Sequence, residues 1–90
     1  MALLDDEAVM SGLRDLPGWE RRGNEIVKTF EHRDFAEAMA FVNRVAGLAE
    51  DVNHHPDIDI RWNKVTLALS THSLGGLTEN DLNLASRIES

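Results

Sequence analysis

Apolar residues recur with the period of an amphipathic helix in three stretches of the sequence. The first covers Asp5 to Leu16, with acidic residues at its start and Pro17-Gly18 after its end. The second covers Asp34 to about Asp51, and the third runs from Thr78 to the last residues. The side chains expected to face the core are Val9, Met10, Leu13 and Leu16 in the first helix, Phe35, Met39, Val42, Ala46 and Ala49 in the second, and Leu82, Ala85 and Ile88 in the third.

Strand patterns fill the gaps between these helices. Trp19–Arg21 and Glu25–Phe30 flank Arg22-Gly23-Asn24, which has the residues of a hairpin turn. Farther on, two sets of alternating apolar residues flank an expected turn at Asn63-Lys64; they are Ile58, Ile60 and Trp62, then Val65, Leu67 and Leu69. Trp62 shares its parity with the two isoleucines, so a core position is expected for it.

The element order is therefore α-β-β-α-β-β-α. It predicts an α+β fold in a single domain, residues 1–90, with a four-stranded antiparallel sheet and its helices packed on one face. A chain of 90 residues has a thin core of its own, which favours self-association as a homodimer or homotetramer. An edge strand and the long second helix are the expected contacts.

Charge and composition narrow the classes of function. The chain carries 16 acidic and 9 basic side chains, for a net charge of −7, which disfavours binding to nucleic acid or to an anionic membrane. It has no cysteine, so a disulfide scaffold, a cysteine-ligated zinc site and a cysteine nucleophile are excluded. The first residues have neither the basic start nor the apolar run of a signal or membrane span, and a cytoplasmic location is expected.

The candidate chemistry lies where the second helix ends. His54 and His55 precede Pro56, which disfavours helical geometry at His55, and adjacent side chains on extended backbone point to opposite sides. The two imidazoles should therefore have different roles. Antiparallel pairing of the second hairpin would bring one of them near His72 at the end of the last strand. Histidines near carboxylates such as Glu50 and Asp81 could supply an acid and a base at neutral pH.

The spacing of these residues resembles the signature of the pterin-4a-carbinolamine dehydratases. The run is Glu50, three residues, His54-His55-Pro56, five residues, Trp62, nine residues, His72, eight residues, Asp81. Flanking words agree, among them Leu69-Ser70-Thr71-His72, Gly76-Leu77-Thr78 and Asp81-Leu82-Asn83. The resemblance extends over nearly the whole chain and is dense after Glu50. Two positions depart from some relatives: Asn53 stands where they have Asp, and Ile58 where they have an aromatic residue.

The resemblance implies an activity and a set of roles. The family dehydrates 4a-hydroxytetrahydropterin to quinonoid dihydropterin and so recycles the cofactor of aromatic amino acid hydroxylases, with no metal or organic cofactor. His54 and His72 match the two histidines with acid and base duty. His55 matches a substrate-binding histidine, and Asp81 and Glu50 match carboxylates near the site. A functional link to a pterin-dependent hydroxylase is also implied.

Other interpretations of the same residues stay open. The paired histidines could be solvated turn residues, Asp81 could act only in a capping box with Thr78, and Glu50 could be a solvated residue of the last helical turn. A zinc site from the three histidines and a carboxylate is a chemical rival. A non-catalytic module that regulates a partner protein is another rival, since animal members of the family also bind a transcription factor. His32 lies outside the motif and is expected at the surface.

Overall fold

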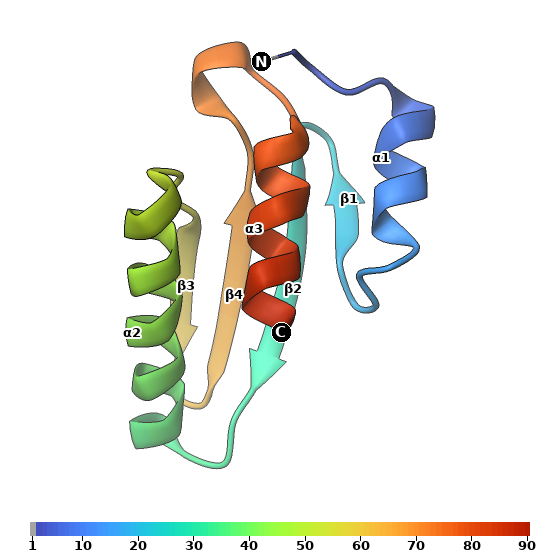
Figure 1. Ribbon diagram of the computed structural model, residues 1–90. Coiled ribbons are helices and arrows are strands. Elements are labelled where there is room, and N and C mark those ends of the chain that lie inside the picture. The colour runs from blue at the N-terminus through green and yellow to red at the C-terminus, as the bar shows by residue number, and fades with distance from the viewer. Residues whose placement is uncertain (1) are drawn as a thin grey trace.

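The computed structural model describes residues 2–90, and Figure 1 shows the three α-helices over one face of an antiparallel sheet. The element order is the predicted one, and so is the fold class. The elements are α1 (Asp6–Leu13), β1 (Glu20–Arg22), β2 (Glu25–Glu31), α2 (Phe35–Val52), β3 (Asp57–Arg61), β4 (Lys64–Leu69), the short 3-10 helix η1 (His72–Leu74) and α3 (Glu79–Glu89).

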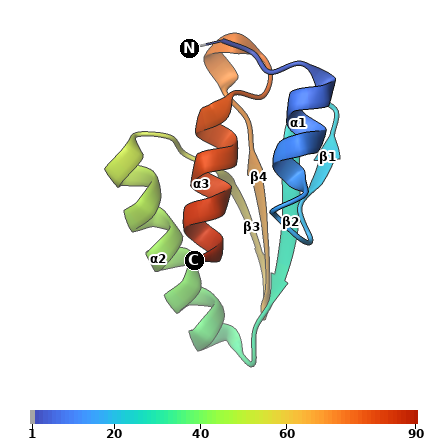
Figure 2. The same cartoon turned by 45° about the vertical axis from the view of Figure 1, so that its right-hand side comes forward.

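The sheet has the strand order β1-β2-β4-β3, with every neighbouring pair antiparallel. In the β3–β4 hairpin, Asp57 pairs with Ala68 and Arg61 pairs with Lys64. The start of β3 and the end of β4 therefore lie at the same end of the sheet. The C-terminal end of α2 lies beside this end of the sheet, and the first turn of α3 lies over it, as the two views show (Figures 1 and 2). This convergence is the part of the fold that positions the candidate site.

The core lies between the sheet and the helices. Its fully buried side chains come from the inward positions of β2 and β4 and from all three helices; the largest are Ile26, Leu67, Leu69, Leu84, Val9, Val45 and Val65. Each of the three α-helices begins at a side chain that caps it. Asp5 and Asp34 cap α1 and α2 through their side chains, and Thr78 with Asp81 forms a complete capping box on α3.

The predicted inward face of two helices is partly wrong. In α1, Met10 is exposed, whereas Val9 and, beyond the helix end, Leu16 are buried. In α2, the residues buried against the sheet are Ala38, Val45 and Ala49, and Phe35 and Ala46 of the predicted stripe are exposed. The apolar surface of α2 is wider than the area that the sheet covers. Periodicity alone therefore does not locate the face that packs on the sheet.

The prediction that Trp62 lies in the core is also wrong. The hairpin turn consists of Trp62 and Asn63, one residue earlier than expected, and Trp62 has a positive φ of 52° with 66% of its surface exposed. Ile58 and Ile60 do pair with the inward-facing Leu67 and Val65. They remain 37% and 38% exposed because β3 is an edge strand of the sheet.

Among residues 2–90, none of the helices has both the length and the apolar character needed to cross a lipid bilayer.

Candidate active site

The paired histidines follow a tight end to α2. Asn53 takes a left-handed conformation, with φ 50° and ψ 47°, and its N–H donates to the carbonyl oxygens of Ala49 and Glu50. The next N–H, that of His54, also donates to Ala49 O at 3.0 Å. Asparagine is one of the few residues with a side chain that adopts this conformation readily. The departure at Asn53 therefore has a structural reason, since it ends the helix just before the two imidazoles.

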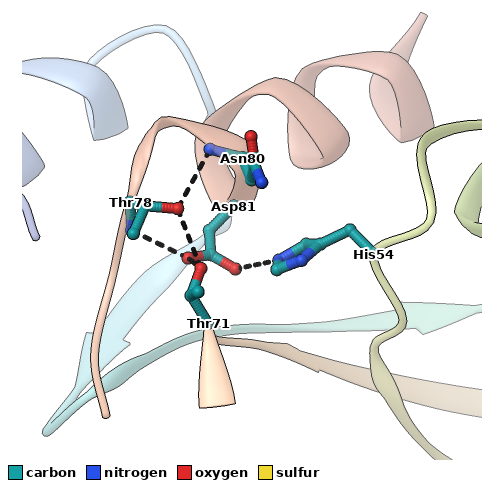
Figure 3. Close-up of polar contacts among 5 residues, drawn as sticks. All are labelled: His54, Thr71, Thr78, Asn80 and Asp81. Atoms are coloured by element: carbon teal, nitrogen blue, oxygen red, sulfur yellow. Dashed lines mark hydrogen bonds and ion pairs between the residues drawn. The ribbon is translucent and has the colours of Figure 1, made fainter. Parts of the chain in front are cut away.

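His54 turns inward and meets a buried carboxylate. Its Nε2 lies 2.5 Å from Oδ1 of Asp81, which belongs to the first turn of α3 (Figure 3). The His54 side chain is 11% exposed and that of Asp81 is fully buried. The two residues are 27 positions apart in sequence. A buried carboxylate with this contact can orient the imidazole.

His55 turns to a different partner. Its Nε2 lies 2.5 Å from Oε2 of Glu50, the residue five positions earlier in the last turns of α2. Both side chains are largely exposed, at 54% for His55 and 76% for Glu50. The two neighbouring imidazoles thus have separate partners and surroundings, as the sequence predicts. Glu50 is both solvent-exposed and in contact with the second histidine.

His72 lies at the same end of the sheet, but its setting differs from the predicted one. β4 ends at Leu69, and His72 begins η1 after two intervening residues. Its side chain is exposed and makes no hydrogen bond or ion pair within residues 2–90. Its connection to the other histidines runs through the preceding residue, because the Thr71 hydroxyl donates to Oδ2 of Asp81 at 2.9 Å. The hairpin register therefore brings His54 and the start of η1 to one carboxylate.

Thr71 and Thr78 are functional candidates that sequence reasoning missed. Their hydroxyl oxygens lie 2.8 Å apart, and Thr78 N donates to the same Asp81 oxygen as Thr71 does, at 2.9 Å. Thr78 was noted only as a helix cap. Thr71 is flagged by its place next to His72, but nothing in the sequence indicates that its side chain points inward. Asp81 completes the capping box of α3 and is also the hydrogen-bond partner of His54.

His32 is not the surface residue that was expected. Its ring packs on Phe41, with centroids 4.9 Å apart, and its Nε2 is shielded from solvent without a hydrogen-bond partner. It belongs to the segment between β2 and α2. Its N–H donates to the carbonyl oxygen of Asn63, and its carbonyl oxygen accepts from the side-chain amide of Asn63. This histidine lies outside the cluster formed by His54, His55 and His72.

The donor set for the zinc hypothesis does not converge. Within the part of the chain that the structure describes, no three His, Asp or Glu side chains gather as ligands for one ion. His54 and His55 each contact a separate carboxylate instead. A groove of about 410 Å³ between α1 and α3 is likewise separate from the site, because it is lined by Ser11, Asp15, Glu79, Ser86 and four small or apolar neighbours.

Comparison with known proteins decides the family. The family model of the pterin 4 alpha carbinolamine dehydratases matches residues 2–90. The chain belongs to this family. Relatives in Thermomicrobium roseum and Roseiflexus castenholzii are 56% and 59% identical over 88 residues, which cover 98% of this chain and 95% of each relative. Both are named provisionally as pterin-4-alpha-carbinolamine dehydratases.

Proteins with similar solved structures are described with more than one kind of function. A protein from Brucella melitensis, described as a transcriptional coactivator/pterin dehydratase, has a TM-score of 0.94 and 32% identity, covering 98% of this chain and 96% of its own. A pterin dehydratase-like RuBisCO assembly factor of the alpha-carboxysome has a TM-score of 0.65 and 24% identity, covering 79% and 82%. The second likeness shows the shared dehydratase fold alone.

Proposed function

We propose that this protein catalyses the dehydration of 4a-hydroxytetrahydropterin to quinonoid dihydropterin and water. The observation that carries the proposal is the pairing of His54 with the buried carboxylate of Asp81 beside the turn that begins at His72, in a chain that belongs to this dehydratase family. The three histidines and two carboxylates of the motif all lie where the α2–β3 connection meets the end of β4.

The reaction needs one proton delivered and one removed. The 4a-hydroxyl leaves as water when a proton reaches its oxygen and the C4a–O bond breaks, with the bonding electrons going to oxygen. The N5–H bond gives its electrons to a new C4a=N5 double bond, and its proton passes to a base. His54 and His72 are the groups proposed for these two transfers, because an imidazole gives and accepts protons near neutral pH.

The second pair has a binding role in this proposal. His55 and Glu50 are exposed and hydrogen-bonded to each other, so they can exchange that contact for polar groups of a pterin. Asp81 is fully buried and acts on the substrate through His54. This arrangement supplies acid–base chemistry from side chains alone, and the proposal includes neither a metal nor an organic cofactor.

A coupled assay tests the proposal. Phenylalanine hydroxylase generates the carbinolamine, and its ultraviolet absorbance is followed with and without this protein. Faster decay that is lost in His72→Ala supports the enzyme. If folded wild-type protein does not accelerate the decay, the catalytic proposal is wrong, and the non-catalytic partner-binding module becomes the better hypothesis.

We also propose that the chain forms a homodimer or homotetramer through α2 and the edge strand β3. Large apolar side chains on these two elements and on the hairpin turn are exposed in the single chain; they are Phe35, Val52, Ile58, Ile60 and Trp62. An edge strand also leaves backbone N–H and C=O groups open to pairing. Sedimentation of wild type and Ile58→Lys tests this: a monomeric wild type would contradict it. A link to a pterin-dependent hydroxylase is part of the proposal and follows from the substrate's origin.

A further inference from the structure

A chain of hydroxyl groups lies beneath the His54–Asp81 contact (Figure 3). The Thr71 hydroxyl donates to Oδ2 of Asp81 at 2.9 Å, and Thr78 Oγ1 lies 2.8 Å from Thr71 Oγ1. The N–H of Asn80 donates to Thr78 Oγ1 at 3.2 Å. Thr71 is 5% exposed, and Thr78 and Asp81 are fully buried. Nothing in the mechanism above uses these hydroxyls, although they occupy a buried position directly behind a proposed catalytic group.

The hydroxyl protons of Thr71 and Thr78 have only one arrangement that agrees with these hydrogen bonds. A hydroxyl has a single proton to donate, and the Thr71 proton goes to the Asp81 carboxylate. The Thr78 hydroxyl must then donate to Thr71 Oγ1, while it accepts the N–H of Asn80. Oδ2 of Asp81 therefore receives two donors, Thr71 O–H and Thr78 N–H, and an ionised Asp81 offers only acceptors at both oxygens.

The same arrangement dictates which nitrogen of His54 carries a proton. The other carboxylate oxygen, Oδ1, faces Nε2 at 2.5 Å, and an acceptor-only carboxylate requires a donor there. Nε2 is then protonated, and in the neutral imidazole the lone pair lies on Nδ1. Nδ1 makes no hydrogen bond with any group of residues 2–90. It is thus the ring nitrogen left for a ligand.

We propose that Thr71 is a positioning residue that holds His54 in the Nε2–H tautomer, so that Nδ1 is the atom that exchanges a proton with the substrate. The catalytic part of this inference rests on the proposed function, and the tautomer itself does not. Without the Thr71 hydroxyl, Oδ2 of Asp81 accepts one hydrogen bond instead of two. The carboxylate is then freer to rotate away from His54. The imidazole then loses the contact that fixes its orientation and its proton.

Thr71 also anchors the turn that carries His72. Its carbonyl oxygen accepts N–H groups from Leu74 and Gly75, both at 3.0 Å, and its own N–H donates to Gly76 O at 2.7 Å. One residue therefore ties the start of η1 to the carboxylate that holds His54. Loss of its side chain should affect the relative placement of the two proposed proton-transfer groups while the backbone contacts of the turn remain.

The test compares Thr71→Val, which keeps the shape and loses the hydroxyl, with Thr71→Ser, which keeps the hydroxyl. Thr66→Val is the matched control, because Thr66 Oγ1 makes a 2.8 Å hydroxyl pair with Thr29 on the sheet away from the site. Two-bond ¹H–¹⁵N spectra of labelled protein report which ring nitrogen of His54 is protonated, and are recorded as a pH series. The carbinolamine decay assay measures kcat and KM on the same samples.

We expect a protonated Nε2 and a lone-pair Nδ1 at His54 in wild type, Thr71→Ser and Thr66→Val. In Thr71→Val we expect mixed tautomers and a kcat roughly 10–100-fold lower, with KM less affected. A lone-pair Nε2 in wild type would overturn the tautomer assignment without any variant. Unchanged spectra and kcat in Thr71→Val would overturn the role of Thr71. Spectra that change as expected in a protein without dehydratase activity would support the positioning and refute the proposed function.

Discussion

Replacement of Asp81 by alanine measures how much of the fold depends on its buried carboxylate. Two buried donors, the Thr71 hydroxyl and Thr78 N–H, lose their acceptor at 2.9 Å. A buried donor left without a partner costs about 1–3 kcal/mol, so the two together cost about 2–6 kcal/mol. A domain of this size has a free energy of unfolding of about 5–13 kcal/mol. The substitution should therefore remove a large fraction of the stability.

Urea unfolding at one fixed protein concentration, followed by tryptophan fluorescence, measures this loss. Glu79→Ala is the matched control, because Glu79 is an exposed acid in the same first turn of α3 and should cost about 0.3–1 kcal/mol through the helix dipole. Asp81→Asn keeps an oxygen acceptor for both donors and should cost about 1–2 kcal/mol. If Asp81→Ala falls within about 1 kcal/mol of Glu79→Ala, the reasoning from unsatisfied donors is refuted.

Three further outcomes are expected. His54→Ala and His72→Ala should each lower kcat by about 10²–10⁴-fold, whereas His55→Ala should mainly raise KM; equal kinetic effects in all three would contradict the division of roles. Activity should persist in EDTA, and a loss that added Zn²⁺ restores would favour the zinc hypothesis. Gly18→Ala should lower stability by about 1–2 kcal/mol, because its φ is +88°, while Gly47→Ala in α2 should raise it by about 0.5–1 kcal/mol; thermal unfolding that ranks them the other way would contradict this.

The fold could be predicted from the sequence because its signals are local. The capping box of Thr78 with Asp81 and the alternation along β4 depend on neighbouring residues, and both appear in the structure. The failures involve tertiary contacts. Phe35 and Trp62 are apolar residues in the expected periods, yet both are exposed, because α2 has more apolar surface than the sheet covers and the hairpin turn falls one residue early.

The sequence predicts members for the candidate site but does not predict how they are connected. The antiparallel hairpin brings His54 to the end of β4, which follows from strand direction alone. Which carboxylate each histidine takes does not follow from strand direction. Asp81 reaches His54 because α3 begins over that end of the sheet, and Thr71 joins them because its side chain points into the buried space under α3. Those orientations are set by packing between segments that are distant in sequence, so the spacing of the motif does not predict them.

The contact between His54 and Asp81 has a consequence during synthesis of the protein on the ribosome. The carboxylate is made 27 residues after the imidazole that it holds. At about 5–20 residues per second, the imidazole waits roughly 1–5 s for its partner to be synthesised. The proposed acid–base centre is therefore complete only after the first turn of α3 has been made. A nascent chain that stops short of α3 carries His54, His55 and His72 without the carboxylate that contacts His54.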